Sequence, residues 1–137
     1  MDVMIEQALA ADVATHAAAV TVAAMDEVNR RADVIVPPGP LPGTPEWEAE
    51  STTSIPATRQ LAWQLVVLRI QLAAGLDGLE SVIVLRSQGV TWALIAQAAG
   101  VTRQAAHERW GSRVRAVLDR YGEGMPDTVA DDDPPTG

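Results

Sequence analysis

The sequence predicts an all-α fold, with long N-terminal helices followed by three short C-terminal helices. Its apolar residues are largely Ala, with no Phe, and they recur every three or four positions between Gly- and Pro-rich breaks. Ala-rich, Phe-free segments prefer helix to sheet, and that spacing places side chains on one face of a helix. Leu, Val, Ile and four Trp must therefore supply the core.

Residues 1–35 are predicted to hold one N-terminal helix, from Val3 to about Ala32. Asp2 is a suitable N-cap for it. An apolar stripe follows one face of this segment at Ile5, Leu9, Val13, Ala17, Val20, Ala24 and Val28. The stripe is mostly Ala and Val, which is too little apolar surface for a helix that stands alone. It must pack on another helix, either within the chain or across a dimer, and the sequence leaves both open.

Residues 36–54 are rich in Pro and Gly and predict an extended linker or an ordered crossover. The run PPGPLP also fits a proline-rich ligand, although a linker is the simpler interpretation. Trp47 is expected to anchor the end of this segment on a helix. Residues 55–76 then form an apolar helix, and its several apolar sides indicate a place in the core or in a dimer interface.

Residues 77–121 carry regular helix stops and caps, which predict three short helices. The expected bounds are Leu79 to Gln88, Trp92 to Ala99, and Arg103 to about Tyr121. Thr91 and Thr102 are the expected N-caps, and Gly100 ends the middle helix. Two helices joined by a short turn that contains Gly are the signature of a helix-turn-helix domain.

The spacing within this segment agrees with that motif. Ala96 supplies the small residue where the second helix crosses closely, and Gly100 permits a positive φ in the turn. The residues expected to face inward are Ile95, Ala99, Val101, Ala105, Ala106 and Trp110.

Residues 89–110, GVTWALIAQAAGVTRQAAHERW, resemble the segment G-V-S-W-x-x-I-A-x-A-L-G-V-S-R-Q-A-A-x-x-R-F. That segment belongs to small helix-turn-helix DNA-binding proteins of actinobacteria and their phages, which are similar to sigma factor region 4. This chain departs from the pattern at Ala99 and Trp110, both still apolar. The resemblance implies a generic regulatory role, and it does not reach residues 1–56.

A recognition helix inserts its N-terminal residues into the major groove of double-stranded DNA. Arg103 suits guanine and Gln104 suits adenine, while Thr91 and Thr102 suit phosphates beside helix N-termini. The expected DNA-binding residues are Thr91, Thr102, Arg103, Gln104, His107, Glu108, Arg109, Arg113 and Arg115. Of these, Arg109, Arg113 and Arg115 are expected to contact the phosphate backbone.

Each of these residues has a simpler alternative role. For Arg103 the alternative is a surface charge or a pair with Glu108, and for His107 it is a merely solvated position. For Arg113 and Arg115 the alternative is a role in solubility or a pair with Asp119. Trp92 and Trp110 resemble stacking platforms for bases, but their positions favour the core.

Charge is distributed unevenly along the chain, whose net charge is −8. Residues 1–53 carry −7 and residues 122–137 carry −5, whereas residues 85–121 carry +4. The only basic surface therefore falls on the predicted DNA-binding segment. Residues 122–137 are expected to form an acidic, disordered tail that either keeps the protein soluble or competes with DNA.

Several classes of function are disfavoured by residues the chain lacks. It has no Cys and only two His, so no metal site, cofactor or catalytic residues are expected, and we expect no enzyme activity. No run is long and apolar enough for a membrane span. Acids beside the apolar N-terminal run argue against a signal peptide, which favours a cytoplasmic protein.

The expected function is therefore that of a sequence-specific DNA-binding protein, most simply a homodimeric transcriptional regulator that reads DNA with residues 102–120. One such domain covers only about 600–1,000 Å² on DNA, so a second copy would strengthen binding. The alternative is a protein-interaction adaptor, because the acidic N-terminal half suits a basic protein partner.

Overall fold

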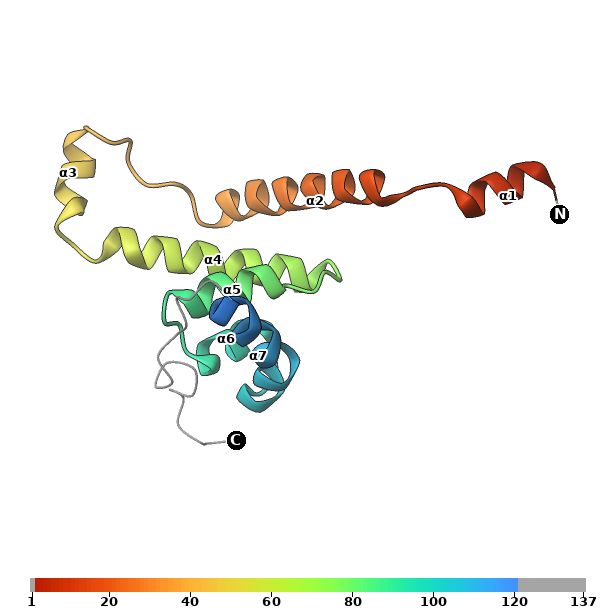
Figure 1. Ribbon diagram of the computed structural model, residues 1–137. Helices are drawn as coiled ribbons and strands as arrows, with labels where there is room; N and C mark the ends of the chain where they lie inside the picture. The colour runs from red at the N-terminus through yellow and green to blue at the C-terminus, as the bar shows by residue number, and fades with distance from the viewer. Residues whose placement is uncertain (1, 121–137) are drawn as a thin grey trace.

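The computed structural model describes residues 2–120, and all regular structure in that range is helical. The helices are α1 (Val3–Ala10), α2 (Ala14–Ile35), α3 (Pro45–Ser51), α4 (Ile55–Ala73), α5 (Leu79–Ser87), α6 (Trp92–Ala99) and α7 (Arg103–Arg120). The acidic tail predicted at residues 122–137 lies outside the described residues. Helices α2 and α4 run side by side in opposite directions, and α5, α6 and α7 pack together beneath α4 (Figure 1).

The prediction of one continuous N-terminal helix is wrong, because the segment is broken between α1 and α2. The two helices are bent by 60° at the break. Ala11 has extended backbone dihedrals, and the Asp12 carboxylate accepts a hydrogen bond from the Ala14 amide at 3.0 Å. This local bond precedes α2, whose N-cap residue is Val13, and it competes with a continuous helix. Within residues 2–120, no single helix is long and apolar enough to span a membrane. Helices α1 and α2 have the required length and composition only when they are counted together, as a bent pair.

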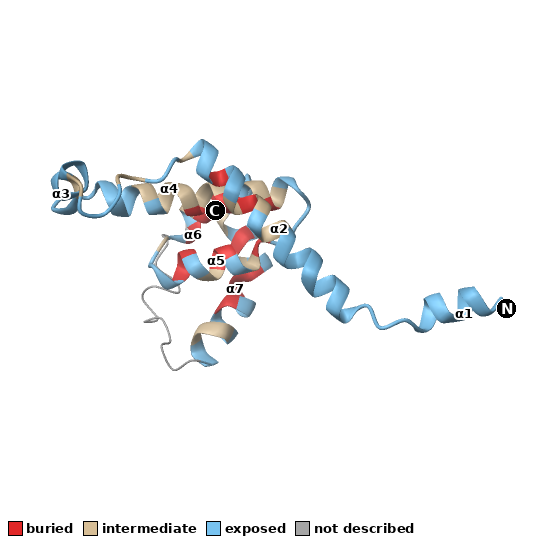
Figure 2. Cartoon of the chain, turned by 90° about the horizontal axis from the view of Figure 1, so that it is seen from above, coloured by how far each residue is buried: buried red, intermediate tan, exposed pale blue. Residues whose placement is uncertain are grey.

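The N-terminal arm, which we define as residues 2–23, projects away from the rest of the described chain. Every residue in it is exposed (Figure 2). Only the second half of α2 joins the fold, where Val28 and Ala32 are buried against Val67 of α4. The expected stripe is therefore mostly uncovered, and Val28 is the only one of its residues that is buried.

Residues 36–54 form an ordered crossover that contains a helix, α3, which the sequence analysis missed. The Thr44 hydroxyl accepts a hydrogen bond from the Trp47 amide, and Pro45 occupies the first turn. Trp47 itself remains exposed, so it does not anchor this segment as expected. The anchor is instead an ion pair, in which Arg59 of α4 donates to both carboxylate oxygens of Glu50, at 2.6 and 3.0 Å.

Helix α4 lies between two separate apolar clusters. Val67 lies on one face of α4 and belongs to the smaller cluster, which includes residues of α2. The next residue, Leu68, belongs to the larger cluster, which includes residues of α5, α6 and α7. The buried members of that larger cluster are Leu68, Val82, Leu85, Trp92, Ile95, Ala96, Ala106, Trp110 and Val114. Helix α4 therefore connects the arm-bearing α2 to the α5–α7 unit.

The bounds of α5, α6 and α7 differ from the predicted bounds by at most one residue at each end. Gly89 follows α5 with a φ of 80°, and Gly100 caps α6 with a φ of 73°. Both glycines adopt the left-handed conformation that other residues rarely take. The turn after α6 closes with a hydrogen bond from the Val101 amide to the Ala96 carbonyl at 3.0 Å.

Candidate nucleic-acid interface

The N-termini of α6 and α7 are each capped by an exposed threonine. The Thr91 hydroxyl accepts from the Leu94 amide at 3.2 Å, and the Thr102 hydroxyl accepts from the Ala105 amide at 3.1 Å. Each cap satisfies one of the backbone amides that a helix start leaves without an intrahelical partner. The remaining amides give both helix ends a partial positive charge that favours anions.

The first two turns of α7 present a polar surface. Gln104 and Glu108 are exposed, and the Gln104 amide donates to the Glu108 carboxylate at 3.1 Å. Arg103 and His107 are half-buried. Glu108 is thus engaged by Gln104 rather than by Arg103, which was the alternative partner considered from the sequence.

Arg103 has an unusual environment for an arginine at a helix start. Its Nε is buried and has no hydrogen-bond partner among residues 2–120. A buried donor without a partner is costly in a folded protein. Arg103 as a whole is only half-buried, so its side chain has both a buried part and a part that is accessible at the start of α7.

His107 is held between an aromatic ring and a glycine. Its ring meets Trp92 edge to face, with centroids 5.2 Å apart. A Cβ on Gly111 would lie 3.2 Å from the imidazole, so the glycine leaves room for the ring. The guanidinium of buried Arg86 lies 4.9 Å from the Trp92 ring centroid on α6. Packing thus fixes the orientation of His107 relative to α6.

Asp77, in the turn between α4 and α5, binds two of the predicted DNA-binding arginines. Its carboxylate accepts from Arg113 at 3.1 and 3.3 Å and lies 3.8 Å from Arg109. Its backbone carbonyl accepts from Arg109 and from the indole of Trp110. Arg113 therefore pairs with Asp77 and not with Asp119, the alternative weighed from the sequence. Arg115 is exposed further along α7.

Trp92 and Trp110 are 2% and 0% exposed, which confirms that they belong to the core and are not stacking platforms. The expectation that Val101 and Ala105 face inward is wrong, because both are exposed. Ala106, the neighbour of Ala105, is the buried residue at this level of the helix. The outer face of α7 therefore begins with Thr102, Gln104, Ala105 and Glu108.

Sequence reasoning missed the Asp77 contacts and the fit of His107 against Gly111. Asp77 is 32 to 36 residues from its arginine partners, and no local pattern signals such a pairing. Gly111 did carry a signal, since a glycine inside a helix costs about 1 kcal/mol relative to Ala and so indicates a close approach.

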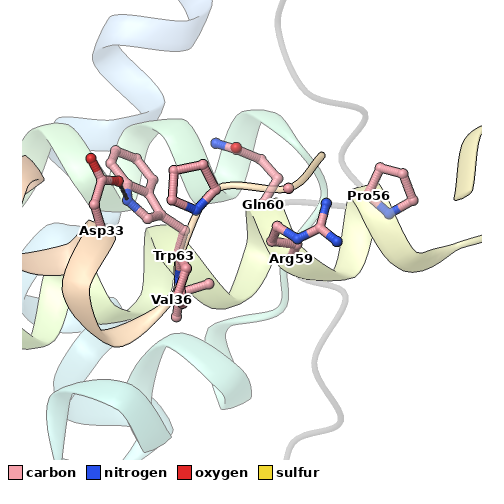
Figure 3. A pocket seen from close by; sticks show the side chains of 9 residues that line it. Asp33, Val36, Pro56, Arg59, Gln60 and Trp63 are labelled. Carbon is pink, nitrogen blue, oxygen red and sulfur yellow. Dashed lines mark hydrogen bonds between the residues drawn. The ribbon is translucent and has the colours of Figure 1, made fainter. Parts of the chain in front are cut away.

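A separate cavity of about 460 Å³ lies between the start of the crossover and α4 (Figure 3). Asp33 accepts a hydrogen bond from the Trp63 indole at 2.8 Å across one end of it, and Arg59 at the other end is bound by Glu50. A Cβ on Gly39 would overlap the Arg59 guanidinium. Because its charged groups already bind one another, we assign these contacts to holding the crossover on α4.

Among residues 2–120, no three His, Asp or Glu side chains lie close enough together to hold a metal ion. Helix α7 carries five Arg and two acids, which makes it the most basic helix described. No family model, curated protein or solved structure matches this chain. The function therefore has to be inferred from the geometry and charge of α6 and α7.

Proposed function

We propose that the chain is a sequence-specific DNA-binding protein and transcriptional regulator, in which α6 and α7 act as a helix-turn-helix and α7 enters the major groove. The observation that carries this proposal is the uncovered N-terminal end of α7. Thr102, Gln104 and Glu108 are exposed there, Arg103 is half-exposed, and Trp92 at the start of α6 meets His107 of α7. Recognition helices contact base edges through these first residues.

The proposed roles follow from side-chain chemistry. Arg103 binds guanine O6 and N7, and Gln104 exchanges its intrahelical bond to Glu108 for an adenine edge. Thr91 and Thr102, with the neighbouring backbone amides, bind phosphates. His107 lines the groove-facing side next to α6.

Arg109, Arg113 and Arg115 contact the DNA backbone in this proposal. Two of them are oriented by Asp77, which also offsets part of their charge. Backbone contacts set affinity and register, while Arg103 and Gln104 supply sequence preference. The overall charge of −8 does not oppose this arrangement, because the acids lie mainly in the first 53 and last 16 residues.

The test begins with selection of bound fragments from random DNA at two salt concentrations. Arg103→Ala is then compared with Arg69→Ala, which removes an exposed arginine from α4. We expect Arg103→Ala to weaken binding to the selected site by about 1–3 kcal/mol while random DNA is little affected. Arg69→Ala should bind both as the unaltered chain does. Equal loss on both DNAs would remove Arg103 from base reading.

A second candidate function, a protein-interaction adaptor, is favoured by the uncovered, acidic N-terminal arm. Salt dependence separates the two. Phosphate binding predicts that log affinity falls with log salt by about 0.9 for each neutralised phosphate. An absence of DNA binding at low salt would favour the adaptor.

A further inference from the structure

The N-terminal arm exposes more apolar surface than a solvated helix requires. Seven of its large apolar side chains are between 51% and 76% exposed: Val3, Met4, Ile5, Leu9, Val13, Val20 and Val22. Helix α1 has eight residues and none of them is buried. A helix this short is not stable alone in water, so its order requires a partner surface.

An apolar groove of about 270 Å³ lies where α2 meets the turn between α4 and α5. Val20, Ala24 and Met25 line it from α2, and Leu76 and Leu79 line it from the other side, where Asp77 and Glu80 also border it. Val20 also belongs to the arm, so the exposed apolar face of the arm continues directly into this groove. The same chain thus carries an uncovered apolar helix and an unfilled apolar groove.

We propose that two copies of the chain exchange arms, so that α1 of each copy occupies the groove of the other. Helix α2 runs unbroken from Ala14 past the groove-lining residues and holds its own α1 away from that groove (Figure 1). Two α2 helices in opposite directions would bring Ile5 and Leu9 of one copy beside Met25 and Leu76 of the other. Such a contact is two-fold symmetric and closes on itself.

The arm supplies a large part of the area that a dimer of this kind needs. Burying a fully exposed aliphatic side chain removes roughly 100 Å² of apolar surface, so seven side chains that are 51–76% exposed offer roughly 450 Å² per copy. A standard interface takes about 800 Å² per partner. The exposed Ala residues of the arm add to the apolar area and allow the helices to approach closely.

The charge of the arm disfavours two other occupants. Residues 2–25 contain three acids and neither Arg nor Lys. Such a segment is repelled by an anionic lipid surface and by a DNA backbone. A second copy of the chain can bury the apolar stripe and leave these acids in solvent.

The biological use of this dimer rests on the proposed function, since two copies would present two α7 helices to two half-sites. The exchange itself is tested without DNA. If the chain does not bind DNA, the proposed function fails but the dimer measurement still stands. If the chain is monomeric, the arm exchange fails but the DNA-binding measurement still stands.

The first experiment measures self-association of the full chain by sedimentation equilibrium at micromolar concentrations. We expect a dimer for the unaltered chain. Leu9→Glu places a charge in the proposed contact twice per dimer, so association should weaken by roughly 100-fold or more. Val34→Glu is the matched control, because Val34 is equally exposed on α2 but lies outside the arm and groove, and it should remain dimeric.

The second experiment locates the contact with disulfides, which the absence of native Cys makes unambiguous. Chains carrying Leu9→Cys and chains carrying Leu76→Cys are mixed and oxidised. Arm exchange predicts a mixed disulfide between the two variants, and little product when Val34→Cys replaces Leu76→Cys.

Three results would overturn the proposal. They are a monomer at all micromolar concentrations, an unchanged dimer in Leu9→Glu, and a disulfide within single chains of the Leu9→Cys, Leu76→Cys double variant. The last would show that α1 folds back on its own α2. Binding of a monomeric chain to phosphatidylglycerol vesicles would identify a membrane as the occupant instead.

Discussion

Asp77 offsets part of the positive charge on α7. One carboxylate faces Arg113 and Arg109, and all three side chains are about half exposed. Ion pairs at this exposure contribute only about 0–1 kcal/mol to stability. Their larger effect is on the two arginines, because Asp77 offsets their charge and turns both guanidinium groups toward the turn between α4 and α5.

We therefore predict that Asp77→Asn strengthens DNA binding with little change in stability. Removal of the carboxylate releases two arginines, and each new phosphate contact should steepen the slope of log affinity against log salt by about 0.9. The unfolding free energy should fall by less than about 1 kcal/mol. Binding is followed by fluorescence anisotropy at several salt concentrations, and unfolding by urea titration.

Glu80→Gln is the control for net charge, because Glu80 is exposed nearby and its removal changes the charge equally. It should tighten DNA binding less than Asp77→Asn. If the two variants gave the same slope of log affinity against log salt, Asp77 would not be limiting the contacts of Arg109 and Arg113 with phosphates.

The residues of the candidate interface differ in how far the sequence predicted their positions. Thr91 and Thr102 were predicted as caps and are caps, since capping depends only on neighbours within three residues. Ala105 was placed on the wrong side of α7, because two adjacent alanines give no information about which one is buried. The partners of Arg109 and Arg113 depend on a distant turn and could not be predicted.

At the scale of elements, Gly100 ends α6 two residues before Thr102 caps α7. Its φ of 73° lies in the left-handed region, and a Cβ built there meets nothing within 4 Å. Any cost of adding a side chain therefore comes from the backbone and not from a clash.

We predict that Gly100→Ala lowers the free energy of unfolding by about 1–2 kcal/mol, which is the cost of a left-handed conformation for a residue with a Cβ. Gly100→Asn should lose less, because Asn tolerates this conformation. Urea titrations of the two variants against the unaltered chain measure the difference. Equal loss in both would mean that backbone conformation is not the cause.

The elements that the sequence predicted well are those whose caps and stripes agree, as in α5, α6 and α7. The N-terminal segment was misread because its apolar stripe continues past Asp12, while the side chain of Asp12 binds the first backbone amide of a new helix. Helix α3 was missed because the prolines around it dominate the pattern. Thr44 followed by Pro45 is nevertheless a helix-start signal that the sequence carries.

At the scale of the whole molecule, α4 joins two apolar clusters that differ in size. Val67 and Leu68 are adjacent and buried, yet they face opposite partners. The smaller cluster holds α2 on α4 through Val28, Ala32 and Val67. The larger one holds α5, α6 and α7 together. The docking of the arm-bearing α2 and the stability of the candidate interface should therefore be separable.

We predict that Val67→Ala and Leu68→Ala have different effects despite their adjacency. Leu68→Ala leaves a cavity in the larger cluster and should lower the free energy of unfolding by about 2–5 kcal/mol. Val67→Ala removes less volume from the smaller cluster, so it should mainly loosen α2.

Amide hydrogen exchange resolves the two effects, because local opening is read out segment by segment. In Val67→Ala, exchange should accelerate in the second half of α2 while α5–α7 keep their protection. In Leu68→Ala, it should accelerate throughout α5–α7. Uniform acceleration in both variants would show that the two clusters unfold as one cooperative unit.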